Sequence, residues 1–270
     1  KLVRRIGGGG FAEVWEARTS QDVPCAVKVS LRPLDGETAQ IQKELQTLEL
    51  LKGLGGHPHV VSLMDVWQIG GYLVTRWELA PDEKARSLED LLQYYQAEGQ
   101  RGIPIKELFR YIYDAAQGID FLNNQGIVHR DIKPGNLLLF WGRVKVGDLG
   151  LAKFVGASTA SHTGAGTWGY LPPEAYQGRI GPAVDLYSLA ATYVRLRTGR
   201  EPFGDSPMEI LERQKNGQPI LDGLRPEEAA LVREALSPDP AARPQSGAMA
   251  WVRKLYQACF PSHQAGPKPQ

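Results

Sequence analysis

Hydrophobic and polar residues follow one pattern up to about residue 85 and another after it. In the first part, short runs alternate apolar with polar residues, which is typical of strands. "KLVRRI" and "AEVWEART" flank a run of four glycines, and "VPCAVKVS" adds β-branched residues to the alternation. "HVVSLMDVWQ" and "YLVTRWEL" follow, joined by the turn-forming pair Gly70-Gly71. Only residues 37–56 differ, because their apolar positions recur every three to four residues, as in a helix, and the run ends in glycines.

After residue 85 the apolar residues recur mostly at helical spacing. "SLEDLLQYYQ" opens with a Ser-x-x-Asp cap pattern. Residues 105–126 predict a long helix with one apolar face that stops at Gly126. The apolar positions of that face are Leu108, Ile112, Ala115, Ile119 and Leu122. Strands first and helices afterwards predict an α+β protein with two lobes.

The expected division is a small β-rich N-lobe with one helix (residues 1–78) and a larger, mostly helical C-lobe (79–260). Residues 127–182 read as a loop-rich region of the C-lobe. The last residues, 261–270, read as a disordered tail or linker. Because the chain begins with Lys almost on the glycine run, we expect it to be a fragment of a longer protein, whose membrane anchors or further domains would lie outside it.

The amino-acid composition limits the kinds of binding partner that we expect for this chain. The 270 residues are 42% hydrophobic and 23% charged, as in ordinary globular proteins. Thirty-one Lys and Arg against 30 Asp and Glu leave a net charge of +1, which gives no reason to expect nucleic acid or an anionic membrane as partner. Cys25 and Cys259 cannot form a disulfide framework, and no apolar run reaches the roughly 18 residues of a membrane span. We therefore expect a reducing, cytoplasmic location for this fragment.

The glycine run "IGGGGFAEV" has four possible interpretations. A strand–loop–strand hairpin can lay backbone N–H groups over phosphate oxygens, since glycine allows close approach. A dinucleotide loop would lead into a helix, and a P-loop would continue with Gly-Lys-Ser/Thr; neither follows here. A plain glycine-rich turn stays open on this evidence.

Lys28, in "CAVKVS", is ambiguous by itself. Alternation places Ala26 and Lys28 on one face of a strand. The lysine is either a solvated edge residue or one held by a carboxylate from the following helix. Glu44 is placed for that role, with Glu49 as the second choice.

Two loops contain acidic residues that could take part in catalysis or metal binding. "IVHRDIKPGNLLL" sets Asp131 and Asn136 five residues apart, with Lys133 between them. Such a loop can aim a carboxylate at a hydroxyl nucleophile and an amide at a metal. "VKVGDLGLAK" then places Asp148 after apolar strand residues, where its oxygens suit a hard cation such as Mg²⁺.

With these motifs in this order, the chain resembles the Ser/Thr protein kinase domains of the eukaryotic-like, bacterial (Hanks) type, from "IGGGGFAEV" to "DPAARP". The resemblance implies the two-lobed protein kinase fold and the use of ATP. The glycine loop would then cover the ATP phosphates. The implied ATP-binding residues are Gly7, Gly8, Gly9, Gly10, Val14, Ala26, Lys28, Thr75, Trp77 and Asp148. Thr75 would be the gatekeeper beside the adenine, and backbone groups of residues 76–78 would bind that base.

The resemblance also assigns catalytic roles. Lys28 would contact the α- and β-phosphates and pair with Glu44. Asp131 would accept the proton of the substrate hydroxyl, and Lys133 near the γ-phosphate marks Ser/Thr specificity. Asn136 and Asp148 would hold Mg²⁺, with Mn²⁺ as the alternative cation.

"GTWGYLPPEA" resembles the end of a kinase activation segment. Thr167 would lie near the catalytic Asp, and Glu174 would pair with a buried Arg243. Asp185 would brace the catalytic loop. Arg130 would pair with a phosphorylated residue of the segment. We expect autophosphorylation at Thr163 first, with Ser161 among the other acceptors and a homodimer as one arrangement for the reaction; the alternative is a plain soluble loop.

Three positions depart from the family pattern: Ala12 replaces the third loop glycine, Leu149 the usual Phe, and Pro172 the usual Ala. None removes a charged group that phosphoryl transfer needs. The expected function is ATP-dependent phosphorylation of Ser/Thr hydroxyls on proteins. A pseudokinase scaffold and a small-molecule kinase of related fold are the alternatives, and the "GTWGYLPPE" segment with Lys133 argues against the second.

Overall fold

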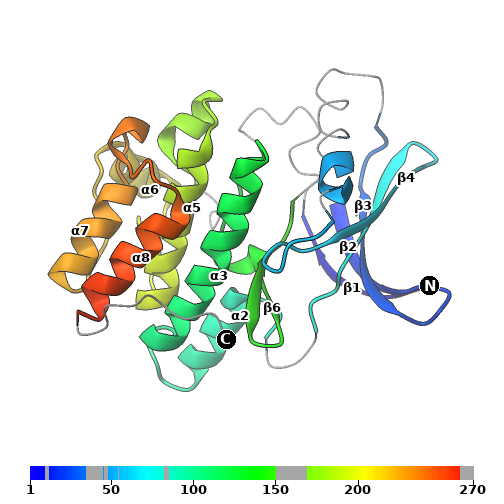
Figure 1. Ribbon diagram of the computed structural model, residues 1–270, viewed down its shortest axis with the longest axis horizontal. Helices are drawn as coiled ribbons and strands as arrows, with labels where there is room; N and C mark the ends of the chain where they lie inside the picture. The colour runs from blue at the N-terminus through cyan, green and yellow to red at the C-terminus, as the bar shows by residue number, and fades with distance from the viewer. Residues whose placement is uncertain are drawn as a thin grey trace. The chain divides into compact units, whose positions relative to one another are not determined.

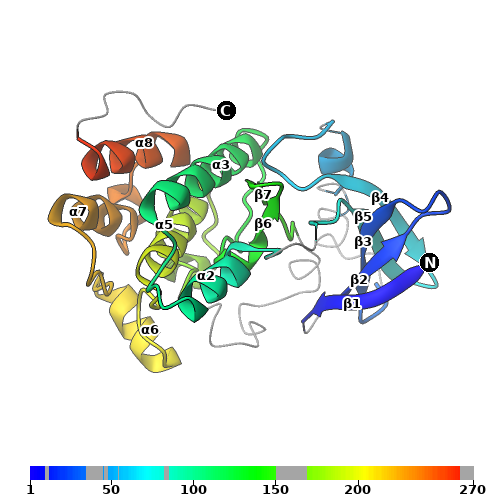
Figure 2. The same cartoon turned by 90° about the horizontal axis from the view of Figure 1, so that it is seen from below.

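The computed structural model describes residues 1–9, 12–34, 45, 48–53, 55–81, 85–149 and 169–261. Contacts divide the chain into two compact units. The first unit is Lys1–Ala80 together with Asp148–Thr163, and the second is Pro81–Gly147 together with Gly164–Gln270. Figures 1 and 2 together label their helices and strands. The first unit contains the larger sheet and the second most of the helices, as the change of pattern near residue 85 predicts.

The first unit is built on a five-stranded sheet in which every neighbouring pair is antiparallel. Its strands are β1 (Leu2–Gly8), β2 (Ala12–Arg18), β3 (Pro24–Ser30), β4 (Leu63–Ile69) and β5 (Tyr72–Trp77). Their spatial order is β1-β2-β3-β5-β4, which Figure 2 shows from below. The predicted turn between β4 and β5 is present, and both of its glycines have positive φ, at 57° and 84°. Two positive-φ residues define the two-residue hairpin turn that matches the twist of the strands.

A short helical stretch precedes β4. Residues 45 and 48–53 are helical, and Leu48 is buried. The remaining predicted helical positions before residue 45, Ile41 among them, lie outside the described residues. Leu48 contributes to the apolar core of this unit with Leu73, which is fully buried on the sheet.

The second unit is mostly helical. Its helices are α2 (Leu88–Ala97), α3 (Ile105–Asn124), α5 (Pro182–Thr198), α6 (Pro207–Lys215), α7 (Pro226–Ala235) and α8 (Ala248–Cys259). It also contains a two-stranded sheet, β6 (Leu137–Phe140) with β7 (Arg143–Val146), and the short 3-10 helices η1 (Pro134–Asn136), η4 (Pro173–Gln177) and η5 (Pro240–Ala242). In Figure 1, α3 is flanked by α5 and α8. The five apolar positions predicted for one face of α3 are all completely buried, so this helix is the core of the unit.

Side chains cap several helices of this unit, α2 and α8 among them. Ser87 and Asp90 form the predicted capping box of α2: the Asp90 N–H donates to Ser87 Oγ at 3.2 Å, and the Ser87 N–H donates to the Asp90 carboxylate at 2.9 Å. The first turn of α8 is capped from α3, because the Ala248 and Met249 N–H groups donate to the two carboxylate oxygens of Asp120 at 2.8 and 2.9 Å. Sequence-local and long-range caps thus fix the ends of these helices.

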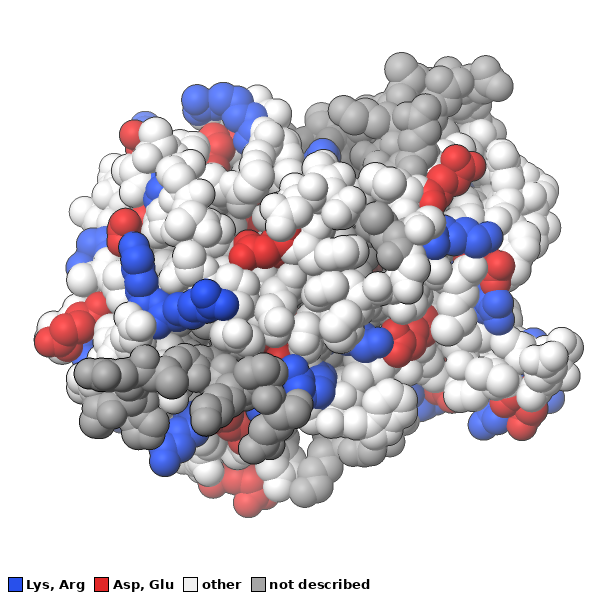
Figure 3. Space-filling view, viewed as in Figure 1, with Lys and Arg blue, Asp and Glu red and all other residues white. Residues whose placement is uncertain are grey.

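The surface carries both charge signs. On the face drawn in Figure 3, Lys and Arg side chains are interspersed with Asp and Glu. Of the helices in the described part of the chain, none combines the length and the apolar character needed to cross a membrane.

Candidate active site

The glycine run forms the turn between the first two strands. β1 ends in the glycines and pairs antiparallel with β2, with Gly8 opposite Glu13 and Gly7 opposite Val14. The Gly9 N–H donates to the Ala12 carbonyl at 3.0 Å, and Ala12 is buried at the first position of β2. Because a strand follows the glycines, the geometry is that of a hairpin and excludes a dinucleotide-type loop, which would lead into a helix. Gly10 lies outside the described residues.

Lys28 lies in the interior of the sheet. β3 runs between β2 and β5, and Lys28 is opposite Val14 on one side and Thr75 on the other. Its ammonium group forms an ion pair and hydrogen bond with Asp148, and only 11% of its side chain is exposed. The solvated-edge reading of this lysine is therefore wrong. The pairing with Glu44 falls outside the described residues, and Glu49, the second choice, is exposed.

Thr75 is the most enclosed polar residue of the sheet. It is completely buried, and its Oγ1 accepts a hydrogen bond from Trp77 Nε1 at 2.8 Å. The Trp77 ring is itself buried, and Trp77 is opposite Ala26 across the strand pair. The indole N–H therefore has its acceptor, and this hydrogen bond fixes Thr75 two residues before β5 ends at Trp77.

The second unit carries the Asp131 loop. Asn136 Nδ2 donates to the Asp131 carboxylate oxygen Oδ2 at 2.8 Å and to the Asp131 carbonyl at 2.7 Å. Lys133 Nζ lies 3.1 Å from the same Oδ2. The turn of η1 makes this possible, because the Asn136 N–H donates to the Lys133 carbonyl at 3.0 Å and brings the two ends of the loop together. Three predicted site residues thus meet at one carboxylate oxygen.

Asp185, in the first turn of α5, supports this loop from beneath. It is completely buried and accepts from the N–H groups of His129 and Arg130, both at 2.8 Å. Arg130 has a φ of +68°, in the left-handed region that non-glycine residues rarely adopt. Two charge-assisted hydrogen bonds to consecutive N–H groups offset the strain of that conformation.

His129 is a site residue that sequence reasoning missed. Its Nδ1 accepts from the Asp131 N–H at 3.2 Å, so the proton belongs on Nε2, which donates to the Gly147 carbonyl at 2.8 Å. The Gly147 N–H in turn donates to the Asn136 carbonyl at 2.8 Å. The ring therefore ties the Asp131 loop to the residue just before Asp148. The only signal in the sequence was its place in "HRD".

Glu174 and Arg243 form the expected buried ion pair. The two guanidinium nitrogens meet the two carboxylate oxygens at 2.5 and 2.8 Å, and both residues are almost fully buried. Arg243 also donates to the carbonyls of Ser237 and Ala183, and its guanidinium lies 4.8 Å from the centre of the Tyr187 ring. This bidentate contact holds the "PPE" end of the segment against the start of α5.

Tyr170 provides a second anchor near that end. Its hydroxyl donates to Glu201 at 3.0 Å, and Arg195 of α5 forms ion pairs with both Glu201 and Glu89. Burial raises the pKa of Tyr170 well above its usual value and also raises the pKa of Glu201. The phenol therefore stays protonated and acts as a hydrogen-bond donor.

Two of the predicted metal ligands carry oxygen atoms that could hold a divalent cation. Asn136 donates its amide hydrogens to Asp131, so its side-chain carbonyl oxygen is not used in these hydrogen bonds, and Asp148 has carboxylate oxygens. Such hard oxygen ligands fit Mg²⁺. Asp148 has a φ of +55°, an unusual conformation for a residue of this kind. No group of three or more His, Cys, Asp and Glu residues that could hold a metal ion occurs in the described ranges.

The regulatory residues are only partly described. Arg130 Nε is buried and has no hydrogen-bond partner among the described residues. The expected phosphorylation sites Ser161 and Thr163, and the anchor Thr167, lie outside those residues.

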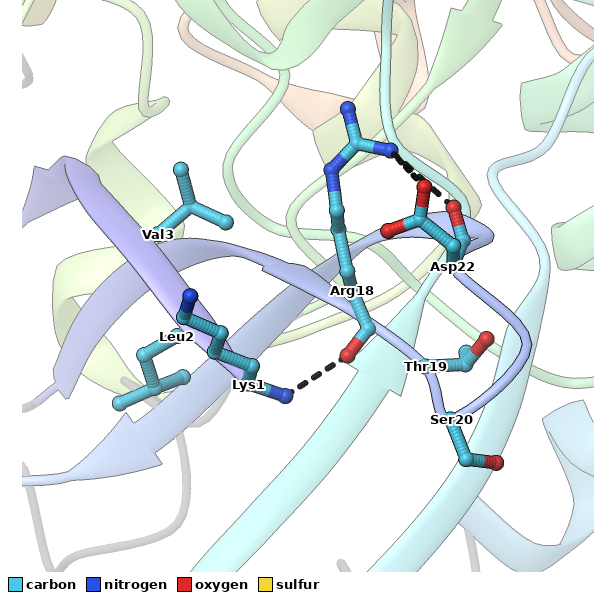
Figure 4. A pocket seen from close by; sticks show the side chains of 7 residues that line it. All are labelled: Lys1, Leu2, Val3, Arg18, Thr19, Ser20 and Asp22. Carbon is cyan, nitrogen blue, oxygen red and sulfur yellow. Dashed lines mark hydrogen bonds and ion pairs between the residues drawn. The ribbon is translucent and has the colours of Figure 1, made fainter.

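A pocket elsewhere in the first unit does not resemble a nucleotide site. Figure 4 shows it beside Lys1 and Arg18, at the end of the β1–β2 pair opposite to the glycine turn. Arg18 already donates to the backbone and side chain of Asp22, and the α-amino group of Lys1 donates to the Arg18 carbonyl. The Arg18 guanidinium and the α-amino group are therefore already hydrogen-bonded to groups that line the pocket.

Comparison with known proteins agrees with this geometry. A family model described as "Protein kinase domain" matches residues 1–256. A probable protein kinase of Dictyostelium discoideum is 32% identical over 73% of the chain, and the serine/threonine-protein kinase PknK of Mycobacterium bovis is 31% identical over 91%. The human serine/threonine-protein kinase STK11 is 29% identical over 93%.

The chain is thus a protein kinase domain and belongs to the protein kinase family. The two-lobed α+β fold expected from the sequence is confirmed. The relatives come from bacteria and eukaryotes alike, so the expected bacterial type stays a prediction. The chain spans 55%, 22% and 60% of the lengths of these three relatives.

Proposed function

We propose that this domain transfers the γ-phosphoryl group of ATP to Ser and Thr hydroxyls of protein substrates. The observation that carries the proposal is the convergence of Asn136 and Lys133 on the Asp131 carboxylate. The names of two of the three relatives described above point to the same specificity. Intact Lys28, Asp131, Asn136 and Asp148 argue against a pseudokinase scaffold.

Each residue contributes positioning or charge, since phosphoryl transfer asks little covalent chemistry of the protein. Asp131 Oδ2 is occupied by Asn136 and Lys133, so Oδ1 is the oxygen that accepts the proton of the attacking hydroxyl. Lys133 offsets the charge of the γ-phosphate. Lys28, held by Asp148 before nucleotide binds, turns to the α- and β-phosphates.

A bound magnesium ion would supply positive charge beside the phosphates of ATP. We assign Asn136 and Asp148 as its protein ligands, with Mn²⁺ as an alternative ion. The backbone of Gly7, Gly8, Gly9 and Gly10 would cover the phosphates. Val14, Ala26, Thr75 and Trp77 would line the adenine site.

Arg130 suggests how the activity of the domain is regulated. Its Nε is a buried donor with no partner among the described residues, which suits a phosphorylated Ser161 or Thr163 as the missing acceptor. We propose autophosphorylation of this segment, with a homodimer as the reacting species. Both cysteines are free and buried, which suits a reducing, cytoplasmic location.

The function is tested with radiolabelled ATP, Mg²⁺ and a generic basic protein substrate. Asp131→Asn removes the proton acceptor and is expected to lower kcat by about 10²–10⁴-fold while MgATP binding persists. Lys28→Met is expected to weaken MgATP binding as well. Asp222→Asn, an exposed change from acid to amide, serves as the matched control. Wild-type incorporation no higher than that of Asp131→Asn would refute the proposal, and labelling of a small aminoglycoside or sugar in place of protein would favour the alternative kinase class.

A further inference from the structure

Among Gly7, Gly8 and Gly9, the close packing is at Gly8, which the family's Gly-x-Gly-x-x-Gly pattern leaves unspecified. A Cβ placed on Gly8 would lie 2.5 Å from the Arg5 guanidinium nitrogen Nη2 and 3.3 Å from the Ala12 carbonyl oxygen. A Cβ on Gly7 would make ordinary van der Waals contact at 3.8 Å, and one on Gly9 would meet nothing within 4 Å. A side chain at Gly8 would therefore have to displace the Arg5 guanidinium, which lies where its Cβ would be.

Arg5 reaches that position because its guanidinium is held from the opposite strand. Arg5 Nε lies 3.4 Å from Glu13 Oε1, and the other carboxylate oxygen of Glu13 accepts from Trp15 Nε1 at 3.2 Å. Glu13 is directly opposite Gly8 in the register of β1 and β2. Arg5, Glu13 and Trp15 thus form a clasp that crosses the base of the glycine turn.

We propose that this clasp, Arg5–Glu13–Trp15, positions the glycine turn for MgATP and thereby sets the nucleotide affinity. The inference rests on the proposed function, since it assumes that the turn covers the phosphates. None of the three residues is assigned contact with the nucleotide, so they act as positioning residues. Their side chains bridge the two strands that carry the turn, which limits how far the Gly7–Gly9 backbone can open.

The exposure of the Arg5 and Glu13 side chains sets the size of the expected change in MgATP affinity. The Arg5 and Glu13 side chains are 54% and 32% exposed, and an exposed ion pair has a modest strength. We therefore expect Arg5→Gln and Glu13→Gln each to raise the Kd for MgATP by about two- to fivefold. Turnover at saturating ATP is expected to stay unchanged, because the groups around Asp131 are untouched.

The two substitutions also separate positioning from simple charge attraction. Glu13→Gln removes a negative charge, so electrostatics alone would strengthen the binding of an anionic nucleotide. The clasp predicts weaker binding for both variants. Tighter binding by Glu13→Gln would overturn the proposal.

A neighbouring ion pair supplies the matched control. Arg4 Nε lies 3.0 Å from Glu16 Oε2 on the same two strands, with the Arg4 side chain 53% exposed, but among the described glycines none has Arg4 as a nearest neighbour. Arg4→Gln and Glu16→Gln make the same changes of charge and are expected to leave the Kd unchanged. Equal effects of Arg4→Gln and Arg5→Gln would also overturn the clasp.

Gly8→Ala provides a coupling test. The added methyl group must displace the Arg5 guanidinium, so Gly8→Ala alone is expected to weaken MgATP binding. In the Arg5→Gln background, Gly8→Ala is expected to raise the Kd for MgATP little further. This non-additivity would show that both substitutions act through the same contact. Additive effects would refute the clasp.

Binding is measured first on the wild type, by titration calorimetry. If the wild type does not bind MgATP, the proposed function itself is refuted. If the wild type binds MgATP and Arg5→Gln binds it equally well, only the clasp is refuted.

Discussion

At the scale of single residues, the most consequential contact outside the catalytic groups is that between Glu174 and Arg243. Both charges are removed from water, and each is compensated mainly by the other. A pair of this kind adds little net stability compared with an apolar pair, but removing one partner leaves an uncompensated buried charge. The segment end near Glu174 therefore depends on a residue 69 positions away.

Glu174→Gln is expected to lower the free energy of unfolding by about 3–5 kcal/mol, because the amide leaves the guanidinium without a counter-charge. Urea unfolding measures the change. Glu209→Gln is the control, since it breaks the exposed ion pair with Arg213 and is expected to cost at most about 0.5 kcal/mol. A loss below about 1 kcal/mol for Glu174→Gln would contradict this account.

At the scale of elements, the β6–β7 hairpin carries an unfavourable turn residue. Trp141 and Gly142 connect the paired residues Phe140 and Arg143 with φ of +48° and +79°. Two positive-φ positions define a turn in which Asn-Gly is the preferred sequence, whereas a bulky aromatic residue is strained there. Trp141 is also 75% exposed, so its ring gains little from burial.

Trp141→Asn is expected to raise the free energy of unfolding by about 0.5–1 kcal/mol, because Asn tolerates the left-handed conformation. Chemical denaturation of the variant against the wild type measures this. Kinase activity is the accompanying readout and is expected to stay unchanged. A destabilised variant would mean that the contact of the Trp141 ring with Phe140, 6.2 Å between centroids, outweighs the strain.

The individual helices, strands and loops also show which features could be predicted from the sequence. The periodicity of α3, the Ser87 cap and the glycine hairpin each depend on neighbours in the chain, and each was predictable from local pattern. The positions of Asp131, Lys133 and Asn136 followed from a loop of six residues. The two nitrogens of His129 and the capping of α8 by Asp120 depend on segments far apart in the chain, so no local pattern revealed them.

At the scale of the whole molecule, nucleotide binding is coupled to folding. A ligand that binds only the native chain stabilises it by mass action, by about 2.7 kcal/mol at a hundred times its Kd. Nucleotide is therefore expected to stabilise the complete domain.

MgATP at about a hundred times its Kd is expected to raise the Tm by about 5–10 °C for a chain of this size. Differential scanning fluorimetry measures the shift. EDTA is expected to reduce it, and Lys28→Met to abolish it at the same nucleotide concentration. An equal shift in Lys28→Met would show that the nucleotide binds without this lysine.

The register of the sheet has a consequence for how such a domain can change over evolutionary time. Val14, Lys28, Thr75 and Val66 lie side by side across four strands. A single-residue insertion inside β3 would turn Lys28 to the opposite face, because strand side chains alternate. An insertion in the turn at residues 19–23 would leave its direction unchanged. Drift in chain length is therefore confined to the turns of this sheet, while the lysine-bearing strand keeps its length.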